Sequence, residues 1–144
     1  MSYLLDTCVI SELISRQPDI SVVRWVDKTN ERSLYLSVVT FGEVSRGIAR
    51  LQTPDRKRQL QEWPETDLLD RFADRILPLD AAIMLTWGER VAQLESRGRT
   101  LPLMDSLFVA TAYAHTLTVV TRNVRDFADT GVDLLNPWET GPDE

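Results

Sequence analysis

The chain has 144 residues, of which 43% are apolar, and this is enough for one domain with a single hydrophobic core. Its net charge of −6 argues against a protein that coats nucleic acid with a broad basic surface, because phosphate contacts normally come from clustered Lys and Arg. The lone cysteine, Cys8, excludes an internal disulfide, and no apolar run approaches the roughly 20 residues of a membrane-spanning helix. The first residues lack the features of a signal peptide, so we expect a cytoplasmic protein without a membrane segment.

The first half of the chain alternates short apolar runs with longer helical patterns. Tyr3–Leu5 and Leu34–Val38 are typical of buried strands. Three helices are expected from apolar residues at helical spacing, namely Val9, Ile10, Leu13 and Ile14, then Val22, Val23 and Val26, and then Val44, Ile48 and Leu51. The pattern therefore predicts two consecutive strand–helix units.

The second half continues the alternation. Residues 54–73 are expected to form one or two helices around Pro64, followed by a strand over 75–79 whose proline is tolerated near a sheet edge. The remaining expected elements are helices over 81–95 and 104–115, a strand over 117–121 and a short strand over 132–135. This order predicts an α/β fold with a mostly parallel sheet of four or five strands, flanked by helices on both faces.

Four acidic residues stand where predicted strands lead into helices. Asp6 ends the first strand, Glu43 lies early in the helix after the second strand, and Asp105 opens the helix before the clearest strand. Asp126 follows the exit of that strand. Functional groups of parallel sheets gather beyond the carboxyl ends of the strands, so all four carboxylates are expected to face one cleft.

Each acid also has a structural interpretation. Asp6 and Asp105 are both candidates for helix N-caps, which for either residue alone is the better interpretation. Glu43 could pair with Arg46 on the helix surface, although Gly47 one turn on leaves room for a ligand beside it. Asp126 alone is an ordinary residue of a polar loop.

Taken together, the four acids indicate a metal site, because gathered carboxylates repel one another unless protons or cations neutralise them. Mg²⁺ prefers oxygen ligands and is usually held by one or two carboxylates, water and substrate phosphate. We expect Asp6 and Asp105 as direct ligands, with Glu43 and Asp126 binding through water or completing a second metal position. The predicted reaction is phosphodiester hydrolysis by a metal-activated water.

Other chemistries fit the sequence less well. His115 has no partner for a zinc cluster or a hydrolase triad, and Cys8 in an apolar helical pattern is interpreted as a small core residue. No glycine-rich phosphate-binding loop is present. The four tryptophans are interpreted as core or interface residues, and Arg46, Arg50, Arg122 and Arg125 are candidate phosphate contacts that could equally be ordinary exposed arginines.

Four segments resemble motifs of PIN-domain toxins of the VapC type. The opening motif of that family, an Asp-Thr pair after the first strand, is similar to residues 5–12, although Cys8 stands where family members often have Asn or Ser. Residues 102–112 and 121–127 resemble the family's third acid and its T-x-N-x-x-D-F segment. The ending over 131–138 is similar to the FitB-like branch.

This resemblance implies a single PIN-like nuclease domain over 1–138, with a loosely ordered tail over 139–144. It implies a Mg²⁺- or Mn²⁺-dependent endoribonuclease that is the toxin of a toxin–antitoxin pair, with Thr121 orienting a carboxylate or water. The acidic cluster that it implies consists of Asp6, Glu43, Asp105 and Asp126. It also implies a cognate VapB-like antitoxin, an RNA substrate, a homodimer, and operator DNA bound only through the antitoxin.

Two alternatives stay open from the sequence. The first is a catalytically silent PIN-like binding module that acts through its antitoxin and operator complex. The second is a receiver-like signalling domain, which also places acids and a threonine around Mg²⁺ at strand ends. The absence of paired acids after the first strand, and of a lysine at the end of the last one, argues against the second alternative.

Overall fold

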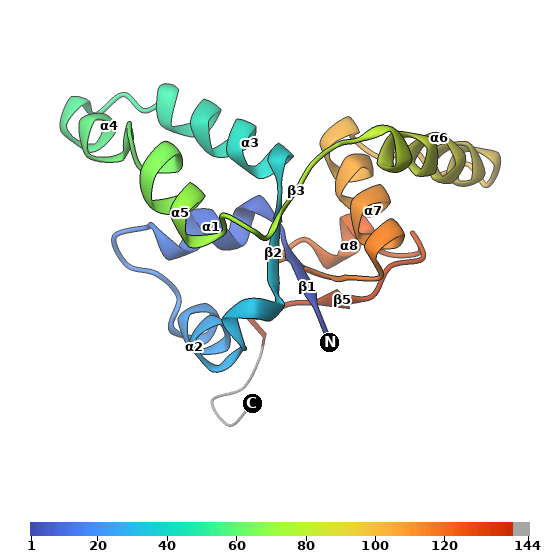
Figure 1. The fold of residues 1–144 in the computed structure, drawn as a ribbon, viewed down its shortest axis with the longest axis horizontal. Helices are drawn as coiled ribbons and strands as arrows, with labels where there is room; N and C mark the ends of the chain where they lie inside the picture. Colours follow the sequence, from blue (N-terminus) through green and yellow to red (C-terminus); the bar gives the residue numbers. More distant parts are fainter. Residues whose placement is uncertain (140–144) are drawn as a thin grey trace.

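The computed structural model describes residues 1–139, which are built on a five-stranded sheet with strand order β3-β2-β1-β4-β5 (Figure 1). The strands are β1 (Tyr3–Leu5), β2 (Leu34–Ser37), β3 (Ile76–Leu77), β4 (Thr118–Val120) and β5 (Leu134–Leu135). All four neighbouring pairs are parallel. Parallel neighbours need crossover connections, and each connection here contains at least one helix. The predicted α/β class and parallel sheet are confirmed.

Helices lie on both sides of this sheet, with α1 to α5 on one side and α6 to α8 on the other (Figure 1). The helices are α1 (Thr7–Leu13), α2 (Ile20–Lys28), α3 (Val38–Ala49), α4 (Pro54–Leu60), α5 (Leu69–Arg71), α6 (Ala81–Ser96), α7 (Leu103–His115) and α8 (Val124–Phe127). A 3-10 turn, η1 (Glu31–Ser33), and a π-helical turn, η2 (Pro64–Leu68), complete the elements. No helix within residues 1–139 is long and apolar enough to cross a membrane.

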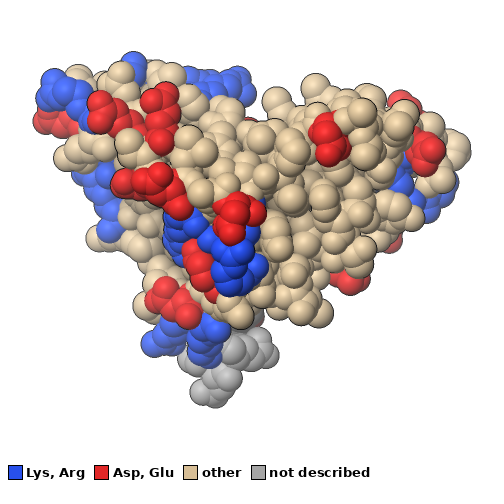
Figure 2. Space-filling view, viewed as in Figure 1, with Lys and Arg blue, Asp and Glu red and all other residues tan. Residues whose placement is uncertain are grey.

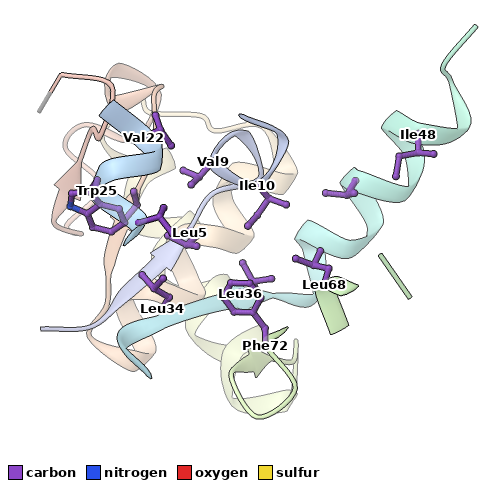
Figure 3. Packing of buried hydrophobic residues seen from close by; sticks show 13 residues of the cluster. Leu5, Val9, Ile10, Val22, Trp25, Leu34, Leu36, Ile48, Leu68 and Phe72 are labelled. Carbon is purple, nitrogen blue, oxygen red and sulfur yellow. The ribbon is translucent and has the colours of Figure 1, made fainter. Parts of the chain in front are cut away.

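Two hydrophobic clusters cover the two faces of the sheet. Leu4 packs in the cluster that contains Phe108 of α7, whereas its neighbour Leu5 packs in the other cluster, which contains Val9 of α1 and Phe72 (Figure 3). Successive side chains of a strand point to opposite faces, so a strand that is covered on both sides needs apolar residues at every position. This explains why Tyr3–Leu5 is a continuous apolar run.

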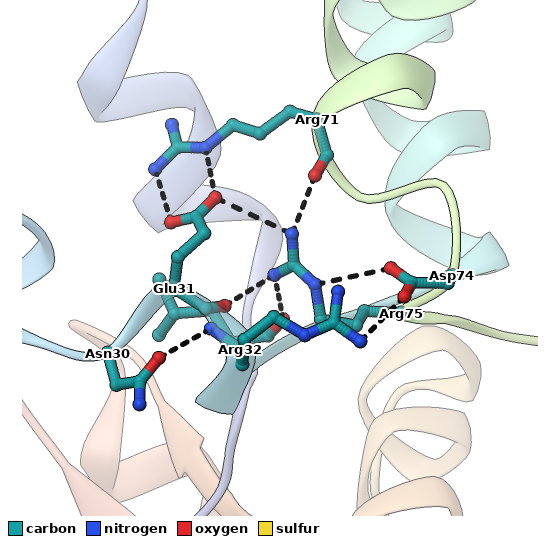
Figure 4. A network of polar contacts seen from close by, with 7 residues as sticks. Asn30, Glu31, Arg32, Arg71, Asp74 and Arg75 are labelled. Carbon is teal, nitrogen blue, oxygen red and sulfur yellow. Dashed lines mark hydrogen bonds and ion pairs between the residues drawn. The ribbon is translucent and has the colours of Figure 1, made fainter.

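A buried arginine ties the edge strand β3 to the rest of the sheet. Arg75 is only 4% exposed, and its guanidinium donates to the carbonyl oxygens of Glu31 at 2.6 Å, Leu34 at 2.7 Å and Arg71 at 2.6 Å (Figure 4). Glu31 also pairs with the side chain of Arg71, at 2.7 Å. Burying a cation is costly unless its donors are satisfied; the three carbonyls are the partners of Nη1 and Nη2, while Nε lies 3.6 Å from Oδ1 of Asp74. The sequence pattern placed Arg75 in a strand and did not predict its burial.

The remaining differences from the sequence-based expectations concern the ends of elements. Val38 begins α3 instead of ending β2, because Ser37 caps the helix by accepting the backbone N–H of Val39 at 3.0 Å. The strand expected over 75–79 is limited to β3, and β3 is an edge strand, as the proline suggested. Asp126 lies in the short helix α8, which corrects its assignment to a polar loop. The tail expected over 139–144 lies outside the described residues from position 140 onward.

Candidate active site

Asp6 sits between β1 and α1, and its carboxylate is held from three sides. Oδ1 accepts the backbone N–H of Thr7 at 2.7 Å, so Asp6 is the N-cap of α1. Oδ2 accepts the hydroxyl of Thr121 at 2.8 Å and the thiol of Cys8 at 3.5 Å. Capping therefore explains one oxygen, while the other is held by residues that have no role in starting the helix. The residue is buried, with 7% of its surface exposed.

Glu43, on α3, is connected to the first helix through Thr7. The Thr7 hydroxyl donates to Oε1 of Glu43 at 2.6 Å and lies 3.1 Å from the hydroxyl of the buried Thr40. Glu43 forms no ion pair with Arg46 in the described part of the chain, so the surface-pair interpretation is wrong. A Cβ added at Gly47 would meet no atom within 4 Å, so the space one turn on is open.

Asp105 lies in the first turn of α7, but it does not cap the helix. Pro102 occupies the N-cap position, and no side chain provides a cap there. Among residues 1–139, the half-buried Asp105 carboxylate has no hydrogen-bond or ion-pair partner, which overturns its interpretation as a cap. This carboxylate is therefore available to a ligand.

The pKa of Asp105 depends on the other three predicted acids. Burial raises the pKa of Asp105 from its ordinary 3.8 to about 6, and the negative charges of Asp6, Asp126 and Glu43 contribute further, in that order. Each of these carboxylates is therefore close enough to disfavour a charge on Asp105. That all four carboxylates face one cleft and bind a metal stays a prediction.

Asp126 is the most exposed of the four acids. It lies on α8, whose start is joined to Thr121 because the Asn123 N–H donates to the Thr121 hydroxyl at 3.0 Å. At the other end, the guanidinium of Arg99 donates to the carbonyl oxygen of Asp126 at 2.8 Å. The Thr121 hydroxyl thus connects the backbone before Asp126 to the carboxylate of Asp6.

The sequence did not predict the contacts of two threonines in this region. Thr7 and Thr40 link α1 to α3 beside Glu43. Thr7 is half of the Asp-Thr pair of the opening motif, so the motif contained a signal for it, whereas Thr40 had none because a buried threonine in a helix is common. Cys8 was interpreted as a core residue, and its contact with Asp6 was not foreseen.

The other chemistries considered from the sequence find no support. Burial raises the pKa of the Cys8 thiol to about 11, with a further contribution from the charge of Asp6, so this thiol is a poor nucleophile at neutral pH. His115 is exposed at the end of α7. The tryptophans pack within the protein, as expected: Trp25 meets the ring of Tyr3 edge-on, and Trp87 donates to the hydroxyl of Ser106.

The donor set at this edge fits a hard divalent cation. All four acids provide oxygen atoms, and none pairs with a Lys or Arg among the described residues. No group of three or more His, Cys, Asp or Glu side chains within residues 1–139 is arranged to hold an ion by itself. Mg²⁺ does not require such a group, since one or two carboxylates with water and substrate phosphate are its usual ligands.

Comparison with known proteins gives a consistent result. The PIN domain model matches residues 3–132. The chain is 36% identical to VapC ribonuclease Y4jK of Sinorhizobium fredii, over 94% of this chain and 97% of that protein, and 37% identical to toxin FitB of Neisseria gonorrhoeae, over 94% and 97%. Among solved structures, the FitAcB complex of Neisseria gonorrhoeae contains a chain with a TM-score of 0.89 and 36% identity, covering 96% of this chain and 99% of that one.

Proposed function

The chain belongs to the PIN-domain family, in the group that includes VapC and FitB, and from this premise we propose that it is a metal-dependent endoribonuclease toxin. The observation that carries the proposal is Asp105, a carboxylate without a hydrogen-bond or ion-pair partner in residues 1–139, whose pKa is raised to about 6 by burial and by three neighbouring carboxylates. A nearby site of unneutralised negative charge favours a divalent cation. Several relatives bear names that state a nuclease activity, among them "VapC ribonuclease Y4jK" and "tRNA(fMet)-specific endonuclease VapC".

In this proposal Asp6 and Asp105 would hold Mg²⁺ or Mn²⁺ directly, and Glu43 and Asp126 would act through water or at a second metal position. The bound ion supplies a water of lowered pKa and offsets the charge of the phosphate. Thr121 orients Asp6 through its 2.8 Å hydrogen bond, so that one carboxylate oxygen stays fixed by the protein. Asp105 makes no such bond and remains free to adjust to the ligand.

The reaction in this proposal is hydrolysis of an RNA phosphodiester bond. A bond forms between the water oxygen and phosphorus, and the bond from phosphorus to the 3′ oxygen breaks. The leaving 3′ oxygen takes up a proton, while the attacking water gives one up. The products therefore carry a 5′-phosphate and a 3′-hydroxyl, whereas attack by the 2′-hydroxyl of the RNA would produce a cyclic 2′,3′-phosphate.

The proposal includes an antitoxin as the partner of this chain. Structures similar to this chain include FitAB bound to the IR36 DNA fragment, at 35% identity and a TM-score of 0.88, and the FitAcB complex. We infer that a VapB-like antitoxin occupies the acidic site of this chain and that operator DNA is bound through that antitoxin. A homodimer and action in the cytoplasm belong to the same proposal.

Cleavage of RNA by the purified, antitoxin-free protein tests the function. We expect cleavage in Mg²⁺ or Mn²⁺, no cleavage in EDTA, and 5′-phosphate ends that a phosphate-specific exonuclease recognises. Asp105→Asn should lose nearly all activity, while Asp129→Asn, an exposed acid outside the cluster, should retain it. A wild-type protein that binds antitoxin and operator DNA but cleaves no RNA in either metal would instead identify a silent binding module.

A further inference from the structure

An RNA strand that reaches the acidic site approaches four carboxylates on a chain with a net charge of −6. Phosphates are repelled by such a surface, so a cation from the protein beside the site would aid binding. On the face shown in Figure 2, Lys and Arg are interspersed with Asp and Glu and form no broad basic surface. A single cationic side chain close to the acids would therefore have to provide this contact.

Arg122 has this placement. It directly follows Thr121, the residue whose hydroxyl holds Asp6. The backbone N–H of Arg122 donates to Sγ of Cys8 at 3.5 Å, and Cys8 in turn contacts the Asp6 carboxylate. The backbone is thus fixed beside the acidic site, while the residue is exposed to solvent.

The guanidinium of Arg122 is oriented by an aromatic ring. Its central carbon lies 5.4 Å from the centroid of the Trp138 ring. Trp138 is itself held, because its indole N–H donates to Oε1 of Glu12 at 3.2 Å and its backbone N–H donates to Oδ1 of Asn136 at 2.9 Å. Contact with an aromatic face orders a guanidinium without using its N–H donors.

This arrangement sets Arg122 apart from other arginines with aromatic contacts. Within residues 1–139, the arginines that lie over aromatic rings are Arg71, Arg75, Arg90 and Arg122. The first three also donate hydrogen bonds to oxygen atoms of the protein. Arg122 has no hydrogen bond or ion pair from its guanidinium to any described residue, so its five N–H donors are available to a ligand.

We propose that Arg122, held over Trp138, is a phosphate-binding residue for the RNA strand beside the acidic site, an inference that rests on the proposed ribonuclease function. A guanidinium recognises phosphate oxygens through paired N–H donors. The contact is made to a phosphate away from the reacting bond, and it therefore stabilises the bound strand before and during the reaction. Its loss should raise KM and change kcat little.

The test uses the full chain and a short fluorescein-labelled single-stranded RNA of mixed sequence. Anisotropy in EDTA measures binding without cleavage, and assays in Mg²⁺ measure KM and kcat. Arg122→Ala should weaken binding about tenfold, as expected for one charge-assisted contact. It should also reduce the slope of log K against log salt by about 0.7, the value for one phosphate contact with a single strand. Arg122→Lys, which keeps the charge, should recover part of the affinity.

Arg97→Ala is the matched control, because Arg97 is an exposed arginine at the end of α6 whose guanidinium forms no hydrogen bond or ion pair with the described residues. Equal effects of the two alanine variants, or unchanged RNA binding by Arg122→Ala, would overturn the proposal that Arg122 binds a phosphate of the RNA. So would a variant that weakens only the complex with the antitoxin, since Arg122 would then be a protein contact. Absence of nuclease activity in the wild-type protein would refute only the proposed function. The anisotropy measurements of RNA binding in EDTA would still decide whether Arg122 contacts RNA.

Discussion

The hydroxyl of Thr121 donates a 2.8 Å hydrogen bond to the carboxylate of Asp6, although the two residues are 115 positions apart in the chain. The pairing of β1 with β4 brings them together, since Leu5 and Val120, the residues before them, are partners in the sheet register. Thr121 is fully buried, so this bond is shielded from water. It fixes one oxygen of Asp6 before any ligand binds.

Thr121→Val should lower metal affinity and stability together. The substitution keeps the shape of the side chain but removes the donor to Asp6 and the acceptor for the Asn123 N–H, which lies 3.0 Å away. We expect the free energy of unfolding to fall by about 1–3 kcal/mol, as for the loss of a buried hydrogen-bond partner. Thr121→Ser should restore both properties. Thr118→Val is the control, because Thr118 lies on β4, the strand directly before Thr121, and forms no side-chain hydrogen bond in the described structure; an equal loss there would refute the role of Thr121.

Asp105→Asn should stabilise the metal-free protein above pH 6. The pKa of Asp105 is raised to about 6 in the fold, from an ordinary 3.8, so the folded state holds this proton more tightly than the unfolded chain. The stability that the group contributes is therefore full below about pH 3.8 and is lost as the pH rises through about 6. Asparagine cannot lose a proton, so the variant should melt higher than wild type in EDTA at pH 7, and the difference should vanish near pH 4.

Added Mg²⁺ should reverse this order of stability. A ligand that binds the folded state raises stability in proportion to the logarithm of its concentration over Kd, so wild type should gain more than Asp105→Asn. Thermal melts of both proteins in EDTA and in millimolar Mg²⁺ make the comparison. Equal Mg²⁺ increments, together with a lower melting temperature of the variant in EDTA, would show that Asp105 is a structural carboxylate.

Antitoxin binding should weaken as Mg²⁺ increases. An arginine of the antitoxin can pair bidentately with a carboxylate of the acidic site, and the metal competes for the same oxygens. Calorimetric titrations of the cognate antitoxin at rising Mg²⁺, with the ionic strength held constant by NaCl, measure the effect. Asp105→Asn should reduce both the affinity and its Mg²⁺ dependence. If neither Mg²⁺ nor Asp105→Asn changes the affinity for the antitoxin, inhibition acts at a surface other than the acidic site.

Arg75→Met should destabilise the fold without a direct effect on the acids. It leaves the carbonyl oxygens of Glu31, Leu34 and Arg71 without the donor that they share, at a cost on the order of 3 kcal/mol. Arg32→Met removes an exposed ion pair with Asp74, which solvent screens, and it should destabilise the fold far less. Urea unfolding of both variants compares them, and similar losses would mean that the Arg75 contacts contribute little.

The sequence by itself determined the elements that rest on local patterns. The apolar runs at Tyr3–Leu5 and 117–121, and the helical spacing between them, were sufficient for the α/β class and the parallel sheet. The acids could also be located at strand ends, because in a parallel sheet every strand delivers its last residue to the same edge. The sequence motifs were enough for the family, since the order and spacing of short segments carry that information.

The tertiary structure decided what each of these residues touches. Asp6 and Asp105 have the same preference for helix N-caps, yet of the two only Asp6 is a cap, because Pro102 occupies the N-cap position of α7 and Asp105 lies in the first turn. The bond from Thr7 to Glu43 depends on how α1 packs against α3, and the burial of Arg75 depends on three carbonyls from distant segments. Local preference is a property of a few neighbouring residues, whereas such contacts are created by sheet register and helix packing, which bring together atoms that are far apart in the chain.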